Sequence, residues 1–106
     1  MTLHCENISF TDLAGQFGTP LYVYSQSALT EAFCAYTSAF STLSPLVCYA
    51  VKANGNLSLL KHFAALGSGF DIVSGGELAR VLAAGGDAGK TIFSGVGKSE
   101  AEIEFA

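Results

Sequence analysis

The feature that most constrains this chain is an uncharged run of strand-forming residues that ends in a lysine. Residues 46–51 (LVCYAV) carry no charge, Lys52 follows them, and residues 54–56 (NGN) favour a turn. Such a run predicts a strand buried on both faces, as in a parallel sheet. The carboxyl ends of parallel strands are where α/β folds place their reactive groups, although a lysine that merely ends a strand has the same pattern.

The rest of the chain after Pro45 repeats this unit. Apolar runs and helical periodicity alternate, with Gly and Ser at the junctions. This alternation predicts an α/β fold whose parallel strands are joined by right-handed crossovers. The expected strands are residues 46–51, 69–73 and 91–94, and the expected helices are residues 56–66, residues 74–85 and a last helix from Ser99 onward.

The segment before Pro45 has a weaker pattern. Residues 1–19 show little periodicity, and residues 21–24 (LYVY) predict a short aromatic strand. A helix is expected from about Ser27, capped by Ser25 or Ser27 and ended by Ser44 and Pro45.

Polar side chains follow each of the predicted parallel strands. They are Lys52, Asp71 with Ser74, and residues 94–98. Because the carboxyl ends of parallel strands lie at one rim, these groups are expected to converge there. Their convergence is the strongest physical argument for a functional site. Ser74 with Glu77 and Ser99 with Glu102 also have the spacing of helix capping boxes, which gives Glu77 a structural explanation.

Composition excludes several classes of function. Half of the 106 residues are hydrophobic, 13% are charged, and the formal charge is −4 without a lysine or arginine cluster, which argues against a nucleic-acid partner. No apolar run is long enough for a membrane span, and the first residues do not read as a signal peptide. The three cysteines and two histidines lack metal-ligand spacing, so no metal site is expected.

Two short motifs resemble nucleotide-binding loops, but each lacks a glycine that such a loop requires. Residues 97–99 (GKS) match the end of a phosphate-binding loop, but Ile92 stands where its first glycine is required. Gly67 and Gly69 begin a dinucleotide fingerprint, but Ile72 holds the place of the third glycine. Neither motif therefore predicts a nucleotide site.

Three ordered blocks resemble a known family. Residues 49–54 (YAVKAN), 69–78 (GFDIVSGGEL) and 93–99 (FSGVGKS) are similar to the amino-terminal part of the diaminopimelate decarboxylases. These enzymes belong to the pyridoxal-phosphate-dependent ornithine, diaminopimelate and arginine decarboxylases, which have an alanine-racemase-like barrel. The resemblance covers about residues 16–106, and the 95–98 segment (GVGK) favours the diaminopimelate branch.

The resemblance implies a fold and a domain organisation. Residues 25–106 would form the first three β/α units of a (β/α)8 TIM barrel that binds pyridoxal 5'-phosphate. Residues 1–24 would belong to the second, β domain of the longer protein. The phosphate loop, the acid that pairs with the pyridine nitrogen and the substrate contacts would lie beyond Ala106, and the residues present would be an inactive fragment.

The resemblance also implies a reaction and site residues. Lys52 would bind the cofactor as an imine, Ala50 would leave room for its ring, and Asp71 would tune the charge at Lys52. The reaction would be decarboxylation of meso-diaminopimelate to L-lysine and carbon dioxide, by a cytoplasmic homodimer. Alternatives are an ornithine, arginine or lysine decarboxylase, a racemase of the same fold, or a non-catalytic protein that carries the cofactor.

Overall fold

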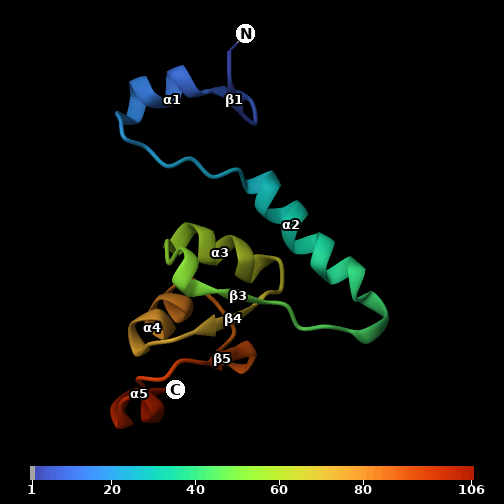
Figure 1. The fold of residues 1–106 in the computed structure, drawn as a ribbon, viewed down its shortest axis with the longest axis vertical. Helices are drawn as coiled ribbons and strands as arrows, with labels where there is room; N and C mark the ends of the chain where they lie inside the picture. The colour runs from blue at the N-terminus through green and yellow to red at the C-terminus, as the bar shows by residue number, and fades with distance from the viewer. Residues whose placement is uncertain (1) are drawn as a thin grey trace. The chain divides into compact units, whose positions relative to one another are not determined.

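The computed structural model describes residues 2–106. The chain forms two compact units that meet in sequence after Ala35, inside helix α2 (Gln26–Ala39). Each unit has its own sheet (Figure 1). No helix among residues 2–106 has both the length and the apolar character that crossing a membrane requires.

The first unit begins with a small hairpin and a helix that the sequence pattern missed. Strands β1 (His4–Cys5) and β2 (Ile8–Ser9) pair antiparallel, and helix α1 (Phe10–Phe17) follows at once. Ser9 caps this helix by accepting a hydrogen bond from the Asp12 amide at 3.1 Å. Two-residue strands are too short for periodicity to reveal them.

The predicted strand at residues 21–24 is wrong. These residues have no regular secondary structure, and the described sheet of this unit contains only β1 and β2. Aromatic residues favour strands only where a neighbouring strand supplies hydrogen bonds and packing, and this segment has no such partner in that sheet.

The start of α2 is held by Ser25, which directly precedes the helix, and by Glu6, which is distant in sequence. Ser25 Oγ accepts from the Ala28 amide at 3.1 Å, which confirms Ser25 as a cap. The Glu6 carboxylate accepts from the Ser27 amide at 2.9 Å and from Ser25 Oγ at 3.1 Å. The Ser27 amide bond is the main reason that the pKa of Glu6 is lowered. The helix ends at Ala39, earlier than predicted, and a 3-10 turn (Ser41–Leu43) leads to Pro45.

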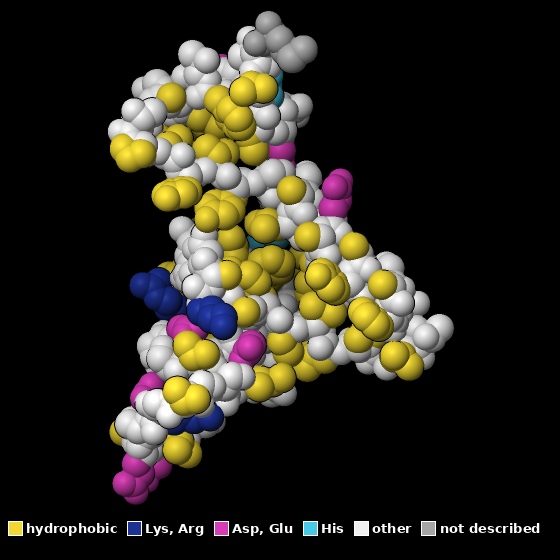
Figure 2. Space-filling view, in the orientation of Figure 1, with side chains coloured by type: hydrophobic (Ala, Val, Ile, Leu, Met, Phe, Trp, Pro, Cys, Tyr) yellow, Lys and Arg dark blue, Asp and Glu magenta, His cyan; other side chains and the backbone are white. Residues whose placement is uncertain are grey.

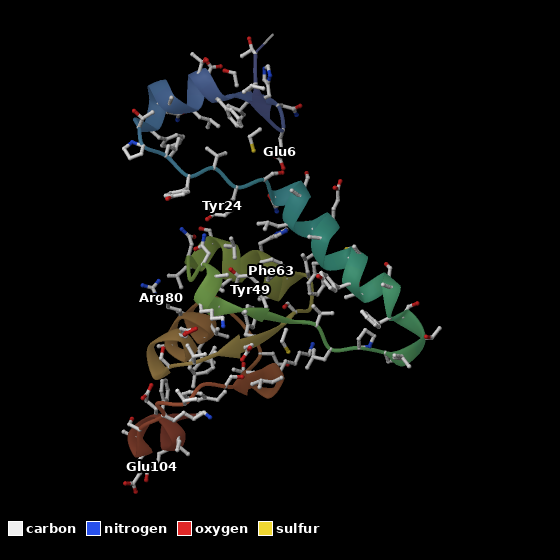
Figure 3. All side chains as sticks on the ribbon, viewed as in Figure 1. Glu6, Tyr24, Tyr49, Phe63, Arg80 and Glu104 are labelled. Atoms are coloured by element: carbon white, nitrogen blue, oxygen red, sulfur yellow. The ribbon has the colours of Figure 1, made fainter. Side chains whose placement is uncertain are left out.

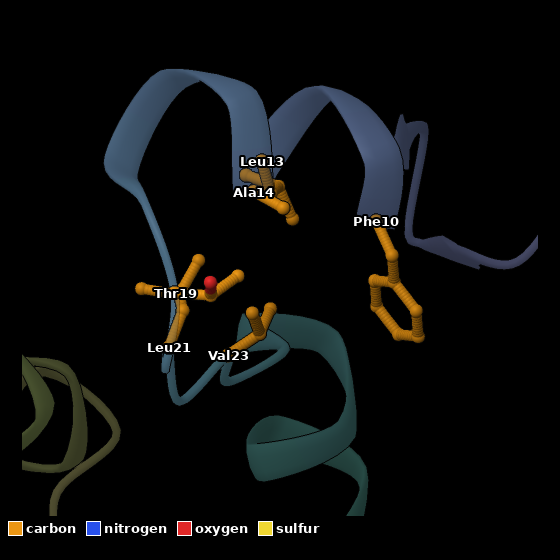
Figure 4. A pocket seen from close by; sticks show the side chains of 6 residues that line it. All are labelled: Phe10, Leu13, Ala14, Thr19, Leu21 and Val23. Atoms are coloured by element: carbon orange, nitrogen blue, oxygen red, sulfur yellow. The ribbon is translucent and has the colours of Figure 1, made fainter.

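The first unit also has apolar side chains at its surface. Figure 2 shows hydrophobic groups around α1, and Leu3, Ile8 and Phe17 are among the exposed ones. A shallow apolar pocket lies beneath α1 (Figure 4). It is lined by Phe10, Leu13, Ala14, Thr19, Leu21 and Val23.

The second unit confirms the predicted alternation of strands and helices. Strands β3 (Cys48–Ala50), β4 (Gly69–Ile72) and β5 (Thr91–Phe93) pair parallel in that order. The strands are shorter than predicted, but their centres are correct. Helices α3 (Leu57–Ala65), α4 (Gly75–Ala83) and α5 (Glu100–Phe105) follow them, and 3-10 turns cover Val51–Ala53 and Ala88–Lys90.

The core lies between one face of this sheet and its helices. Phe70 and Ile72 of β4 are fully buried on that face. Tyr49 of β3 stacks on Phe63 of α3 with ring centroids 4.5 Å apart (Figure 3). Buried residues of both helices complete the core: Leu59, Leu60 and Phe63 from α3, and Leu78 and Val81 from α4.

Helix α5 approaches the same face of the sheet. Phe105 lines a small apolar pocket together with Ile72, Leu78 and Phe93. Phe105 of α5 therefore lies on the side of the sheet that carries Phe70 and Ile72, the side that α3 and α4 cover. The predicted burial on both faces is not found, because Asp71 of β4 is only half-buried and Ile92 of β5 is 53% exposed on the face opposite the core.

The two predicted capping boxes differ in the structure. Ser99 and Glu102 form a complete box at the start of α5, as predicted. Glu102 also accepts from the Gly75 amide at 2.6 Å, which joins the starts of α4 and α5, and this bond is the main cause of its lowered pKa. Ser74 accepts from the Glu77 amide at 3.1 Å, but the Glu77 carboxylate accepts from the Val73 amide at 3.4 Å. The box at α4 is therefore only half formed.

Gly69 is predicted to be intolerant of any side chain. A Cβ at this position would lie 2.6 Å from Cys48 Sγ and 2.6 Å from the Lys90 carbonyl oxygen. The backbone oxygen cannot rotate away, so Gly69→Ala should destabilise the protein by about 1–3 kcal/mol. Gly97→Ala is the matched control, because a Cβ there would meet nothing within 4 Å. Thermal unfolding measures both, in this chain or in a longer polypeptide that contains it. Equal midpoints for the two variants would contradict the packing of β3 against β4.

Candidate active site

Lys52 lies in a turn at the carboxyl end of β3. The strand stops at Ala50, and Lys52 is the middle residue of the 3-10 turn Val51–Ala53. Val51 is 2% exposed, whereas Lys52 is exposed. Because a 3-10 turn does not keep the two-residue alternation of a strand, the spacing from Ala50 to Lys52 does not place their side chains on one face.

Two side chains hold the segment that follows Lys52. The Tyr49 hydroxyl donates to the Asn54 carbonyl at 2.9 Å, and Arg80 Nη1 donates to the Gly55 carbonyl at 3.2 Å. Figure 3 shows Tyr49 beside Phe63, where the stacked ring fixes the direction of its hydroxyl. The turn that carries Lys52 is therefore tied to both α3 and α4.

Ala50 and Asp71 lie side by side on the face of the sheet opposite the core. Ala50 pairs in register with Asp71, and Asp71 pairs with Ile92. In a parallel sheet, residues in register place their side chains on the same face. Phe70 and Ile72, the neighbours of Asp71 in β4, are buried against the helices, so Asp71 lies on the opposite face. This face, which carries Ala50, Asp71 and Ile92, is called the open face below.

Asp71 is bound by a serine that sequence reasoning did not assign. Ser94 Oγ donates to Asp71 Oδ1 at 2.6 Å across 23 residues of sequence. The sequence placed both residues at the carboxyl ends of adjacent strands, which was the available signal. It did not fix the register that brings the two side chains together.

Cys48 has a thiol whose environment depends on Asp71. Burial raises the pKa of Cys48, and the negative charge of Asp71 raises it further. Cys48 is two residues before Ala50 in β3 and therefore also belongs to the open face.

Glu77 carries an unsatisfied oxygen. Its Oε1 is buried and has no hydrogen-bond partner among the described residues, while Oε2 accepts from the Val73 amide. A buried carboxylate oxygen without a donor is costly. The structural explanation from the capping pattern is thus incomplete, and Glu77 joins the candidate residues.

Lys98 has local partners. Its Nζ lies 5.4 Å from the centroid of the Phe93 ring and donates to the Gly95 carbonyl at 3.3 Å. Gly95 adopts a φ of 97°, which favours glycine in this turn. Among residues 2–106, no cluster of His, Cys, Asp and Glu is arranged to bind a metal ion.

The chemistry of these groups suits the aldehyde end of pyridoxal phosphate. Lys52 supplies an exposed primary amine, which is the group that forms a covalent bond with an aldehyde. Asp71 supplies a fixed carboxylate that can stabilise positive charge, and Ala50 beside it occupies little space. The residues present therefore fit the reactive part of the cofactor.

Comparisons with known proteins show the family to which the chain is similar. The family model of the pyridoxal-dependent decarboxylases, pyridoxal binding domain, matches residues 26–106. A diaminopimelate decarboxylase of Neisseria meningitidis is 82% identical over the whole chain, which covers 26% of that relative. The chain spans about a quarter of the length of the curated relatives it matches.

The chain is also similar in structure to solved decarboxylases. The diaminopimelate decarboxylase of M. jannaschi has a TM-score of 0.93 and 34% identity, covering 98% of this chain and 25% of that one. A lysine/ornithine decarboxylase of Vibrio vulnificus has a TM-score of 0.82 and 25% identity, covering 90% of this chain and 26% of that one.

The influence of the Asp71 charge on the Cys48 thiol predicts a change in thiol reactivity. Only the thiolate reacts with iodoacetamide, so a raised pKa makes Cys48 slower than exposed Cys34 near neutral pH. Asp71→Asn removes the negative charge, lowers the pKa of Cys48 and should accelerate its alkylation by about two- to tenfold. Mass spectrometry of cofactor-free protein measures this rate, with Cys34 as the internal control. An unchanged Cys48 rate would show that Asp71 does not face this thiol.

Proposed function

The chain belongs to the pyridoxal-dependent decarboxylases, and we propose that it forms the cofactor-binding part of a diaminopimelate decarboxylase. The full-length enzyme would convert meso-diaminopimelate to L-lysine and carbon dioxide, the last step of bacterial lysine synthesis. Support for the substrate comes from the names of the similar relatives and from the residue patterns at Gly75–Gly76 and 95–98.

The observation that carries the proposal is the position of Lys52. Its amine is exposed in a turn at the carboxyl end of β3, next to the strands that present Ala50 and Asp71. Lys52 would hold the cofactor covalently and carry a proton at Nζ after the substrate's amine displaces it. Bound pyridoxal phosphate delocalises the electron pair that remains when carbon dioxide leaves.

The neighbouring residues have supporting roles in this proposal. The Asp71 carboxylate would stabilise positive charge near Lys52, because an opposite charge favours a protonated nitrogen. Ala50 would leave space for the flat ring beside the open face. The buried Glu77 Oε1 would find its missing donor in the assembled site.

The arrangement of the second unit supports a barrel. Parallel strands with helices on one face form the repeating unit of a (β/α)8 barrel, which has eight strands and about 250 residues. We propose that residues 25–106 are its first three units and that residues 1–24 belong to a second, β domain. The open face would then line the barrel interior.

The remaining parts of the site would come from outside these residues. The phosphate loop, the acid at the pyridine nitrogen and the substrate contacts would follow Ala106, and a homodimer in the cytoplasm is proposed for the full-length protein. Residues 1–106 alone would therefore be inactive. A chimera in which they replace the matching quarter of the Neisseria meningitidis relative provides a full-length host.

Lys52 is predicted to be the lysine that binds the cofactor. Borohydride reduction of the full-length protein with pyridoxal phosphate makes the bond permanent, and peptide mapping should find the label on Lys52. Lys52→Arg keeps the positive charge but cannot form the bond, so activity should fall by about a thousandfold or more while the fold is retained. A label on Lys61, Lys90 or Lys98 would refute this assignment.

The substrate is predicted to be meso-diaminopimelate. Carbon dioxide release by the full-length protein should give a higher kcat/KM for meso-diaminopimelate than for ornithine, arginine or lysine. The fold shared with a lysine/ornithine decarboxylase makes that class the second candidate. A higher kcat/KM for ornithine or lysine would favour a lysine/ornithine decarboxylase. Racemisation without carbon dioxide release would indicate a racemase. Saturable cofactor binding with neither reaction would indicate a carrier protein.

A further inference from the structure

The backbone of Ser94 is held in place by a hydrogen bond to the neighbouring strand, independently of its side chain. Ser94 follows β5 directly, and its amide donates to the Ile72 carbonyl at 2.8 Å. This bond extends the pairing of β4 and β5 by one residue. Ser94 is two residues after Ile92, so its side chain lies on the open face with Asp71.

The bond from Ser94 leaves half of the Asp71 carboxylate available. A serine hydroxyl has a single donor hydrogen, and the 2.6 Å distance to Asp71 Oδ1 is typical of a bond to a charged acceptor. This bond does not involve Oδ2, whose lone pairs can accept a further hydrogen bond. The hydroxyl thus sets the rotation of the carboxylate as well as its position.

The orientation of Asp71 is the main consequence of this bond. Neither residue is fully buried, so water can replace the hydroxyl in solvating the carboxylate. Loss of the hydroxyl therefore has a small expected effect on stability. Water molecules exchange and reorient, so they would not hold the Asp71 carboxylate in one orientation as the serine hydroxyl does.

We propose that Ser94 is a positioning residue that aims the Asp71 carboxylate at the nitrogen through which Lys52 binds the cofactor. This inference rests on the proposed function and adds a residue to that site. Ser94 acts through Asp71 and makes no contact with the cofactor itself. A carboxylate held at a fixed distance stabilises the protonated nitrogen more than one that rotates freely.

The test is the pH dependence of the absorbance of the bound cofactor, which changes when the nitrogen bonded to Lys52 loses its proton. In the full-length holoenzyme, Asp71→Asn should lower the midpoint by about 1–3 pH units, because it removes an opposite charge. Ser94→Ala should lower the midpoint by about half a unit or more, and Ser94→Thr should restore it because it keeps the hydroxyl. The double variant Ser94→Ala with Asp71→Asn should match Asp71→Asn alone.

Thr91→Val is the matched control. Thr91 is also in β5 and loses a hydroxyl bond, from Oγ1 to the Asp87 carbonyl, but its register partner is Phe70 on the core side. The midpoint of the absorbance change in Thr91→Val should equal that of the unmodified enzyme. An unchanged midpoint in Ser94→Ala, or a Ser94→Ala shift that adds fully to that of Asp71→Asn, would overturn the proposal. A holoenzyme in which Lys52→Arg retains this absorbance change would instead overturn the proposed function.

Discussion

The parallel pairing of β3, β4 and β5 is the constraint on which the rest of the second unit depends. It places the side chains of Ala50, Asp71 and Ile92 on one face of the sheet. Phe70 and its register partners, Tyr49 and Thr91, lie on the opposite face. Burial of Phe70 and Ile72 against α3 and α4 then decides which face lies away from the helices. A shift of one residue in β4 would exchange its two faces and bury Asp71 in the apolar core.

The same pairing explains why polar groups can gather at one edge without disturbing the core. The segments that follow β3 and β4 are each secured by their own contacts. The Lys52 turn is held through Tyr49 and Arg80, and the start of α4 is held through Glu102. The open face is then free to carry Asp71 and Ser94, whose hydrogen bond connects β4 to the segment after β5.

Much of this arrangement could be predicted from the sequence. The uncharged run before Lys52 and the Ser-x-x-Glu spacing at Ser99 depend on local patterns, and both produced the expected elements. The predicted strand at residues 21–24 is wrong because these residues favour a strand but do not pair with β1 or β2. The hairpin and α1 were missed because their elements are short.

The site was predictable in outline and not in detail. Lys52 and Asp71 were identified from their positions after predicted strands and from a family resemblance, and their roles remain predictions. Ser94 and the unsatisfied oxygen of Glu77 depend on register and side-chain rotation, which a one-dimensional pattern does not contain. The early end of β3 at Ala50 likewise required the structure.

The most direct test of the central claim is a crystal structure of the full-length protein with pyridoxal phosphate. We expect continuous electron density from Lys52 Nζ to the cofactor, with the ring against the open face beside Ala50 and Asp71. Density that joins the cofactor to another lysine, or a ring on the helix side of the sheet near Phe70, would contradict it.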